Sequence, residues 1–233
     1  MLVPQISIVM ACFNEEKYVS RVIEQVLSQE CVAEFIIIDD ASTDKSYEIM
    51  KSFQDPRIII LRNKSNLGKG ACIKRGLESA TKNIVGIQDA DLEYDPKEYL
   101  RMIQPLIEGK ADAVFGSRFL TFGSRRVLFY WHRLGNQFLT FLVNVVTNLD
   151  LTDMETCFKF ISLDFAKRLE VKENRFGIEP EVTIKLARMK ARIYEVPISY
   201  SGRTYEEGKK IGWKDGFSAI FCIIKYGLLL RRS

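Results

Sequence analysis

Two aspartates, Asp89 and Asp91, stand one residue apart directly after an apolar run that is typical of a buried β-strand. Alternate residues of an extended segment project to the same side, so both carboxylates can face one ligand. Carboxylate oxygens with few other protein ligands suit Mg²⁺ or Mn²⁺, which normally also binds the phosphate oxygens of a substrate. Glu93 adds a third carboxylate if the extended geometry continues. The alternative is a turn that caps the helix expected to begin at Pro96.

The elements that must position these carboxylates alternate along the first half of the chain as strand-like and helical patterns. This alternation predicts an α/β fold with a mostly parallel sheet and helices on both faces. Ligands of such sheets bind beyond the carboxyl ends of the strands. Three of these ends carry polar clusters, namely Asn14-Glu15, Asp39-Asp40 and Asp89-x-Asp91. The expected strands span residues 6–11, 34–39, 57–61, 83–88 and 111–116. The expected helices span residues 15–28 and about 43–53, then a segment that follows the loop 66–70 and ends at about residue 80, and finally 96–108.

The second half of the chain is less regular. Residues 127–147 and 213–230 are predicted to form amphipathic helices rich in aromatic and aliphatic side chains, and residues 192–199 a late strand. A loop rich in glycine and charge is expected over residues 202–216. Because no repeat or Pro/Ser-rich linker interrupts the chain, we expect one domain over residues 1–233, with 1–117 and 118–233 as its two halves.

The two halves differ in charge. The chain has 233 residues and a formal net charge of +4. Residues 1–117 hold 14 basic and 18 acidic side chains, a balance of −4, whereas residues 118–233 hold 20 basic and 12 acidic side chains, a balance of +8. Either two ligands of different charge bind at one site, or the surface charge is distributed this way by chance.

Composition excludes several classes of protein. The 47% apolar and 27% charged residues are typical of a globular chain rather than a disordered or fibrous one. The 5 cysteines include no CxxC pair, which favours a reducing compartment over a disulfide framework or a zinc site. No apolar run reaches the roughly 18–20 residues of a membrane-spanning helix. The basic residues form no dense block of the kind that binds nucleic acid, so no nucleic-acid partner is expected.

Short motifs follow one another in a specific order along the chain. They are Ala11-Cys12-Phe13-Asn14-Glu15, Ile38-Asp39-Asp40-Ala41-Ser42-Thr43-Asp44, Asn66-Leu67-Gly68-Lys69-Gly70, Asp89-Ala90-Asp91-Leu92-Glu93, Gly116-Ser117-Arg118, and Glu195-Val196-Pro197-Ile198 followed by Arg203 and Lys209. This order resembles family 2 glycosyltransferases of the GT-A fold, specifically the dolichol-phosphate mannosyltransferase-like group. The resemblance runs from Ile6 to about Lys214, which is nearly the whole chain.

The resemblance implies roles for individual residues on the donor side. Strand packing is an equal alternative for Ala11 and Ile38, and Lys69 is interpreted as a loop charge rather than a phosphate clamp. The implied metal ligands, for Mg²⁺ or Mn²⁺, are Asp89, Asp91 and Glu93. The implied nucleotide-sugar-binding residues are Ala11, Phe13, Glu15, Ile38, Asp40, Asp89, Ala90, Asp91, Arg118, Arg203 and Lys209.

Basic and acidic residues of the second half are implied to act on the phosphates. Arg118, Arg203 and Lys209 would bind diphosphate and acceptor phosphate oxygens, although a solvated basic face is the alternative for Lys209. Asp153 lies in the implied acceptor loop and is either a base or an orienting group, for instance by pairing with Arg203. An anionic phosphate acceptor hardly needs a base. The implied catalytic set is Asp91, Asp153 and Arg203.

The function that the resemblance implies is inverting transfer of a hexose from a nucleotide sugar, of the GDP-mannose or UDP-glucose type, to a polyprenyl or dolichyl phosphate. A saccharide acceptor and a catalytically silent nucleotide-sugar-binding scaffold are the alternatives. Because the lipid lies in a bilayer, the helices expected over 127–147 and 213–230 are candidates for interfacial contact, unless they only cover the sheet. We expect a cytoplasmic protein, peripheral at the inner membrane face or held by a small membrane-protein partner, and possibly a homo-oligomer.

Overall fold

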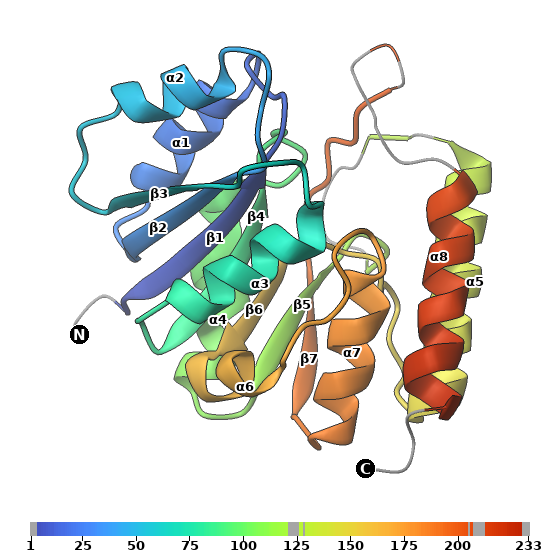
Figure 1. Ribbon diagram of the computed structural model, residues 1–233. Helices are drawn as coiled ribbons and strands as arrows, with labels where there is room; N and C mark the ends of the chain where they lie inside the picture. Colours follow the sequence, from blue (N-terminus) through green and yellow to red (C-terminus); the bar gives the residue numbers. More distant parts are fainter. Residues whose placement is uncertain (1–3, 121–125, 128, 205, 207–212, 230–233) are drawn as a thin grey trace.

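The computed structural model describes residues 4–120, 126–127, 129–204, 206 and 213–229. Within these residues a seven-stranded sheet has the order β3-β2-β1-β4-β6-β5-β7 (Figure 1). Strand β6 runs antiparallel to both of its neighbours and the other pairings are parallel, so the predicted mostly parallel α/β sheet is confirmed. The strands are β1 (Ile6–Cys12), β2 (Val32–Asp39), β3 (Ile58–Arg62), β4 (Ile84–Asp89), β5 (Ala113–Ser117), β6 (Lys159–Ser162) and β7 (Ile193–Pro197).

The central strands β1, β2 and β4 are buried along nearly their whole length. Strands covered on both faces need apolar side chains on both, which is why these segments are nearly continuous apolar runs rather than alternating ones. Their register places Ala11 opposite both Ile38 and Asp89, and Cys12 opposite Asp39. The polar clusters that follow these strands therefore meet at one edge of the sheet.

Helices cover both faces of the sheet (Figure 1). One apolar core joins β1 and β2 to α1, α2 and α4, and the other joins the opposite sheet face to α3, α6, α7, α5 and α8. The helices are α1 (Val19–Leu27), α2 (Ser46–Ser52), α3 (Lys69–Ser79), α4 (Tyr99–Ile107), α5 (Tyr130–Thr147), α6 (Leu163–Arg168), α7 (Ile178–Arg188) and α8 (Trp213–Ile224), with a short 3₁₀ helix at Pro96–Glu98 and a π-helical turn at Lys225–Leu229.

Two helices of the first half begin later than expected. Helix α1 begins at Val19 rather than at residue 15, because Asn14 has a φ of +52° and its side chain accepts a hydrogen bond from the main chain of Thr43. Helix α2 begins at Ser46, whose amide donates to Oδ1 of Asp44 at 2.9 Å. Asn14 and Asp44 tie together the two loops at the carboxyl edge, because Asp44 also accepts a hydrogen bond from the amide of Glu16.

Three elements of the second half were not predicted, namely β6, α6 and α7. Strand β6 is only four residues long, and it inserts between β4 and β5, which come from the first half. Its first residue, Lys159, is fully buried, and so is Glu181 in α7. Buried charges of this kind interrupt the apolar periodicity from which elements are predicted.

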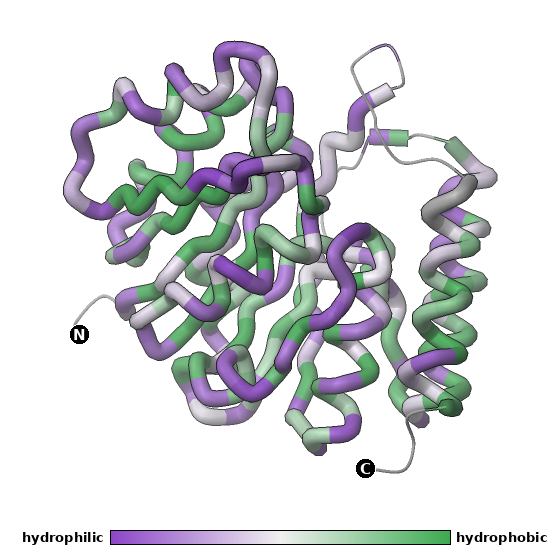
Figure 2. Tube along the Cα trace, in the orientation of Figure 1, coloured by the Kyte–Doolittle hydropathy of each residue, from purple (hydrophilic) through white to green (hydrophobic). Residues whose placement is uncertain are grey.

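Helices α5 and α8 lie side by side at one end of the molecule and carry long apolar stretches (Figures 1 and 2). Both helices were predicted, and each turns one apolar stripe inward and a second one to solvent. The outward stripe, which we call the α5/α8 apolar face, consists of Leu134, Phe138, Phe141, Val145, Phe217, Phe221, Ile224 and Leu228. Within the described residues, no helix has both the length and the hydropathy that a membrane span requires.

Candidate active site

A cavity of about 280 Å³ opens at the carboxyl ends of β1 and β4. The segments that follow the central strands contribute eight predicted site residues to its wall: Ala11, Phe13, Glu15, Asp40, Asp89, Ala90, Asp91 and Glu93. Arg118 and Arg203 reach the same cavity from the segments after β5 and β7. Ile38 is buried in the sheet and Asp153 lies behind Arg118, so neither lines the cavity. Lys209 lies outside the described residues.

The carboxylate of Asp89 is held by Lys69, the first residue of α3. The Nζ atom of Lys69 lies 2.6 Å from Oδ1 of Asp89 and 2.7 Å from Sγ of Cys157. Burial lowers the pKa of Lys69, but Asp89 and Glu179 outweigh it and hold that pKa well above the ordinary value. Lys69 is therefore a buried cation of the cavity wall, and its interpretation as a loop charge was wrong.

Glycine gives the segment before α3 its path along the cavity. Gly68 has a φ of +101°, and a Cβ atom there would lie 2.4 Å from the main-chain oxygen of Asn174. Its amide donates to Oδ2 of Asp40 at 2.7 Å, and the amide of Leu67 donates to Oδ1 at 2.9 Å. Asp40 thus anchors this segment and also faces the cavity.

Arg203 is the cation that gathers the acidic side chains at the opposite wall. Its guanidinium lies 2.8 Å from Asp91, 3.1 Å from Glu15 and 3.4 Å from Glu93. Although burial lowers the pKa of Arg203, Asp91 and Glu15 raise it above its ordinary value. Glu93 also accepts a hydrogen bond from the hydroxyl of Tyr200 at 2.7 Å. This carboxylate therefore ties the segment after β7 to the Asp89–Asp91 turn.

Asp91 has a strongly perturbed carboxyl group. Burial, together with the nearby charges of Asp89 and Glu93, raises its pKa from 3.8 to about 7, although Arg203 opposes the shift. Crowded carboxylates of this kind are stabilised in their charged form by an added cation. The turn therefore has the electrostatic character of a cation site, even with Arg203 in place.

The donor chemistry of Asp89 and Asp91 fits a divalent cation that also binds a diphosphate. Among the described residues, however, the structure has no group of three His, Cys, Asp or Glu side chains arranged to hold a metal ion. The expected set of three carboxylates is thus not assembled, because Glu93 is engaged by Tyr200 and Arg203. A ligand role for Asp89 and Asp91 stays a prediction.

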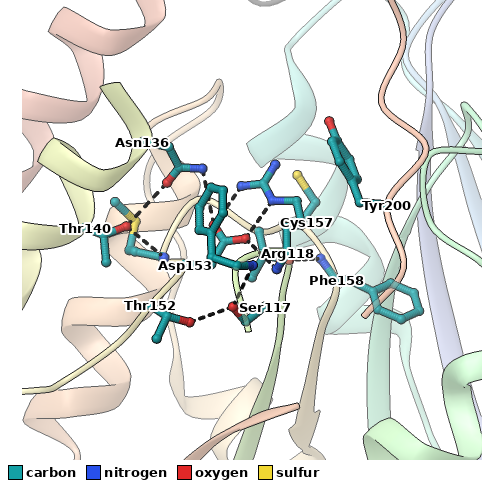
Figure 3. Close-up of polar contacts among 12 residues, drawn as sticks. Ser117, Arg118, Asn136, Thr140, Thr152, Asp153, Cys157, Phe158 and Tyr200 are labelled. Carbon is teal, nitrogen blue, oxygen red and sulfur yellow. Dashed lines mark hydrogen bonds and ion pairs between the residues drawn. The ribbon is translucent and has the colours of Figure 1, made fainter. Parts of the chain in front are cut away.

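Arg118 and Asp153 form a bidentate ion pair next to the cavity (Figure 3). The Nε and Nη2 atoms of Arg118 lie 2.6 and 2.7 Å from the two carboxylate oxygens, and Asn136 donates to Asp153 at 3.3 Å. The expected pairing of Asp153 with Arg203 is wrong, because Arg203 is held by the carboxylates of the other wall. Asp153 is fully buried and lines neither cavity, and its role as an orienting group or as a base stays a prediction.

The loop that carries Asp153 is in turn held by Glu195 of β7. The carboxylate of Glu195 accepts from the amides of Thr152 and Asp153 at distances between 2.9 and 3.1 Å. The hydroxyls of Thr152 and Ser117 lie 2.6 Å apart (Figure 3). The motif residue Glu195 therefore acts on the site through the backbone of this loop.

A second cavity, of about 270 Å³, adjoins the first and shares Arg118 and Tyr200 with it. The guanidinium of Arg118 lies 5.1 Å from the centre of the Tyr200 ring, a cation–π contact. The remaining wall comes from the segment before α5 and from the first two turns of that helix: Phe119, Arg126, Val127, Phe129, Tyr130, His132, Arg133 and Asn136. The second cavity is therefore lined by arginines and aromatic rings.

Several residues of the two cavities were not among the predicted site residues. Tyr200 lies between Ile198 and Arg203 of a recognised motif, so its position was a usable signal. Glu155 and Cys157 belong to the loop of Asp153 and line the first cavity. Arg126 and Arg133 had no motif to mark them, since only the folded chain brings them beside Arg118.

A mostly parallel sheet, carboxylates at its carboxyl edge and a basic cavity beside them define an α/β protein of the GT-A type. The chain belongs to glycosyl transferase family 2, whose family model matches residues 7–169. The predicted family and fold class are thus confirmed, and the chain is a glycosyltransferase.

The solved structures that are similar to this chain include glucosyl-3-phosphoglycerate synthase from Mycobacterium tuberculosis. Its complex with Mn²⁺, UDP and glucosyl-3-phosphoglycerate has a TM-score of 0.74 and 17% identity, and the match covers 96% of this chain and 80% of that chain. Its complex with Mg²⁺ and UDP has a TM-score of 0.72 and 18% identity, with 96% and 79% covered. At this identity the likeness shows the fold alone.

Similar sequences cover nearly the whole chain. An uncharacterised protein of Methanocaldococcus jannaschii is 26% identical over 225 residues, which are 94% of this chain and 91% of that protein. The UDP-N-acetylglucosamine–dolichyl-phosphate N-acetylglucosaminyltransferase of Methanococcus voltae is 25% identical over 246 residues, which cover 97% of this chain and 98% of that protein.

The carboxyl of Glu155 predicts a measurable pH dependence of stability. Burial and the charges of Glu179 and Asp153 raise its pKa from 4.5 to about 7, against the opposing effect of Lys159 and Arg118. Since the folded-state pKa is raised, the folded chain binds the extra proton between these values, and that stabilisation is lost as pH rises through about 7. The free energy of unfolding of the wild type should therefore fall relative to that of Glu155→Gln by about 1–3 kcal/mol between pH 5 and pH 8.

Urea denaturation at a series of pH values measures this difference. Glu48→Gln, a change at an exposed residue of α2, is the matched control and should follow the wild-type pH curve. A Glu155→Gln curve that runs parallel to the wild-type curve would contradict the prediction.

Proposed function

We propose that this chain transfers a hexose-type sugar from a nucleoside-diphosphate sugar to a polyprenyl phosphate, with inversion at the anomeric carbon. The observation that carries the proposal is the junction of two cavities of opposite character at Arg118 and Tyr200. A donor in the first cavity and a phosphorylated acceptor in the second would meet at this junction.

The first cavity has the chemistry that a nucleotide sugar requires. The residues after β1 and β2 supply an aromatic ring and carboxylates, which suit a base and a ribose. Asp89 and Asp91 suit a divalent cation on the diphosphate, and Arg203 adds a fixed positive charge beside them. The volume of the first cavity, about 280 Å³, is near the lower end of the range for sites that bind small molecules.

The second cavity has the chemistry that a phosphate monoester on a hydrophobic chain requires. Arg118, Arg126 and Arg133 line it, and arginine suits phosphate through its planar fork of donors. Phe129 and Tyr130 supply rings that an isoprenoid can contact. A neutral saccharide acceptor carries no charge to complement these three cations, whereas a phosphate does.

The α5/α8 apolar face supports a lipid acceptor. Phe141 on α5 is 60% exposed, and Phe221 on α8 is 63% exposed. Exposed apolar surface of this extent marks a contact with a membrane or another macromolecule. Because α5 also forms part of the second cavity, a lipid whose phosphate lies in that cavity would leave the site along an apolar helix.

The proposed reaction is a single displacement. An oxygen of the acceptor phosphate attacks the anomeric carbon of the sugar as the bond from that carbon to the diphosphate oxygen breaks. Arg118, fixed by Asp153, orients the acceptor phosphate, and Arg203 stabilises the charge on the departing diphosphate. A divalent cation held by Asp89 and Asp91 would supply further neutralisation of that charge.

The named relative from Methanococcus voltae supports a lipid phosphate acceptor, since its name contains a dolichyl phosphate. The name also adds UDP-N-acetylglucosamine to the donors worth testing. Neighbouring structures that contain UDP with Mn²⁺ or Mg²⁺ support a divalent cation.

A panel of donors and acceptors tests the proposed function. The labelled donors are UDP-glucose, UDP-N-acetylglucosamine and GDP-mannose, each offered with undecaprenyl phosphate, with dolichyl phosphate or with a neutral oligosaccharide. We expect a lipid-soluble labelled product from at least one donor in the presence of Mg²⁺ or Mn²⁺, and its loss with EDTA. Transfer to the oligosaccharide alone would support a saccharide acceptor, and the absence of any transfer would support a silent scaffold.

Asp153→Asn separates an orienting role from that of a base. A phosphate acceptor is already ionised, so the variant should lose about tenfold to a hundredfold in kcat/KM through the weakened hold on Arg118, yet still turn over. Asp112→Asn is the matched control, because Asp112 forms the same bidentate pair with Arg192 at the other end of β5. Complete loss of transfer in a correctly folded Asp153→Asn protein would indicate a base.

Vesicle binding tests the proposed role of the α5/α8 apolar face. Replacing Phe141 and Phe221 by serine should lower co-sedimentation with vesicles of anionic phospholipid at least tenfold, since burial of each ring contributes about 1.5–3 kcal/mol. Leu100→Ser, at a 53% exposed residue of α4, is the control and should bind like the wild type. Undiminished binding of the double variant would rule this face out as the membrane contact.

A further inference from the structure

Glu155 carries a buried polar atom that the structure leaves unsatisfied. It lies in the loop between α5 and β6 and lines the first cavity. Within the described residues, no hydrogen-bond partner reaches its buried Oε1 atom. A buried carboxylate oxygen without a donor is costly, and most buried polar atoms in folded proteins have one. The missing donor is therefore evidence for a ligand group at this position.

The cations nearest to Glu155 are already engaged. Lys159 is held by Glu179 and by the main-chain oxygens of Met154 and Thr156. Arg118 forms its bidentate pair with Asp153, as described above. Neither cation can turn to Glu155 without leaving another carboxylate or carbonyl unpaired, so the donor for Oε1 has to come from the cavity.

The loop of Glu155 spans the space between the two ends of the reaction site. Two residues before Glu155, Asp153 holds Arg118 at the junction with the second cavity. Two residues after it, Cys157 accepts from Lys69, which also holds Asp89. Glu155 thus lies between the residues suited to the acceptor phosphate and those suited to the donor diphosphate. The sugar of a bound donor must occupy that interval if it is to be passed from one phosphate to the other.

We propose that Glu155 binds the sugar that is transferred, by accepting a hydrogen bond from one of its hydroxyl or acetamido N–H groups. The inference rests on the proposed function and adds to it the chemical class of the sugar. A neutral hexose or N-acetylhexosamine supplies the missing donor. A uronic acid brings a second carboxylate next to Glu155 and is disfavoured by like-charge repulsion at pH 8, where both groups are ionised. Glu155 is accordingly a residue that determines donor specificity.

Binding and kinetics with Glu155→Gln test the proposal. The probes are UDP, UDP-glucose, UDP-N-acetylglucosamine and UDP-glucuronate, and the corresponding GDP and GDP-mannose pair. We expect the affinity for the free nucleoside diphosphate to stay within about twofold of wild type, while kcat/KM for the preferred neutral sugar donor falls about threefold to tenfold, because the amide oxygen of glutamine still accepts a hydrogen bond but carries no charge. The ratio of kcat/KM for the neutral sugar donor to kcat/KM for the uronate donor should fall at least tenfold.

A second variant and a control keep the result independent of folding. Glu155→Met removes the carboxylate with its unsatisfied Oε1, so we expect an unchanged or higher Tm together with a larger loss in kcat/KM, of about tenfold to a hundredfold. Glu48→Gln, on the surface of α2, should match the wild type in every assay.

The outcomes separate this inference from the proposed function. If the variants lose affinity for UDP as much as for the UDP-sugars, or if both variants have a lowered Tm, Glu155 has a structural role and the proposed contact with the sugar is wrong. If the wild type binds sugar nucleotides but transfers to no lipid, the proposed acceptor fails, and the binding comparison still decides on Glu155. A wild-type chain that binds no sugar nucleotide would overturn both.

Discussion

Charge balance at the carboxyl edge of the sheet is the constraint on which the rest of the structure depends. Asp89, Asp91 and Glu93 come from a single turn and are largely removed from solvent, a state that is costly without cations. Lys69 supplies one cation from the start of α3, and Arg203 supplies the other from the segment after β7. The second half of the chain must therefore return over the sheet, and the excess of basic residues in that half is partly explained by this return.

The placement of β7 at the edge of the sheet follows from the same constraint. Pairing with β5 in parallel brings the carboxyl end of β7 to the edge where the acidic turn lies. From there the segment Tyr200–Arg203 reaches Glu93 through a hydroxyl, an amide and a guanidinium. Several contacts to one carboxylate hold the segment in register with the turn, so the cavity wall formed by Arg203 is fixed by β-sheet pairing as well as by charge.

The central strands and their acidic ends could be predicted from the sequence, because a strand buried on both faces leaves a continuous apolar run. The partner of each charge could not be predicted. Arg118 and Arg203 are equivalent in type, and only their distances in the fold assign Asp153 to the first and Asp91 to the second. Lys69 was misread for the same reason, since a lysine beside two glycines is typical of a surface loop.

The elements that escaped prediction are those in which charges are buried. Lys159 at the start of β6 is fully buried, and Glu181 of α7 accepts hydrogen bonds from two main-chain amides. In a sequence, charged residues such as these are normally interpreted as part of a solvent-exposed face. Burial of charge also fixes the loop from Asp153 to Cys157. Lys159 donates to main-chain oxygens within this loop, and Glu195 accepts from the amide of Asp153. A loop held this firmly does not bring a donor of its own to Glu155, so Oε1 of that carboxyl has no partner among the described residues.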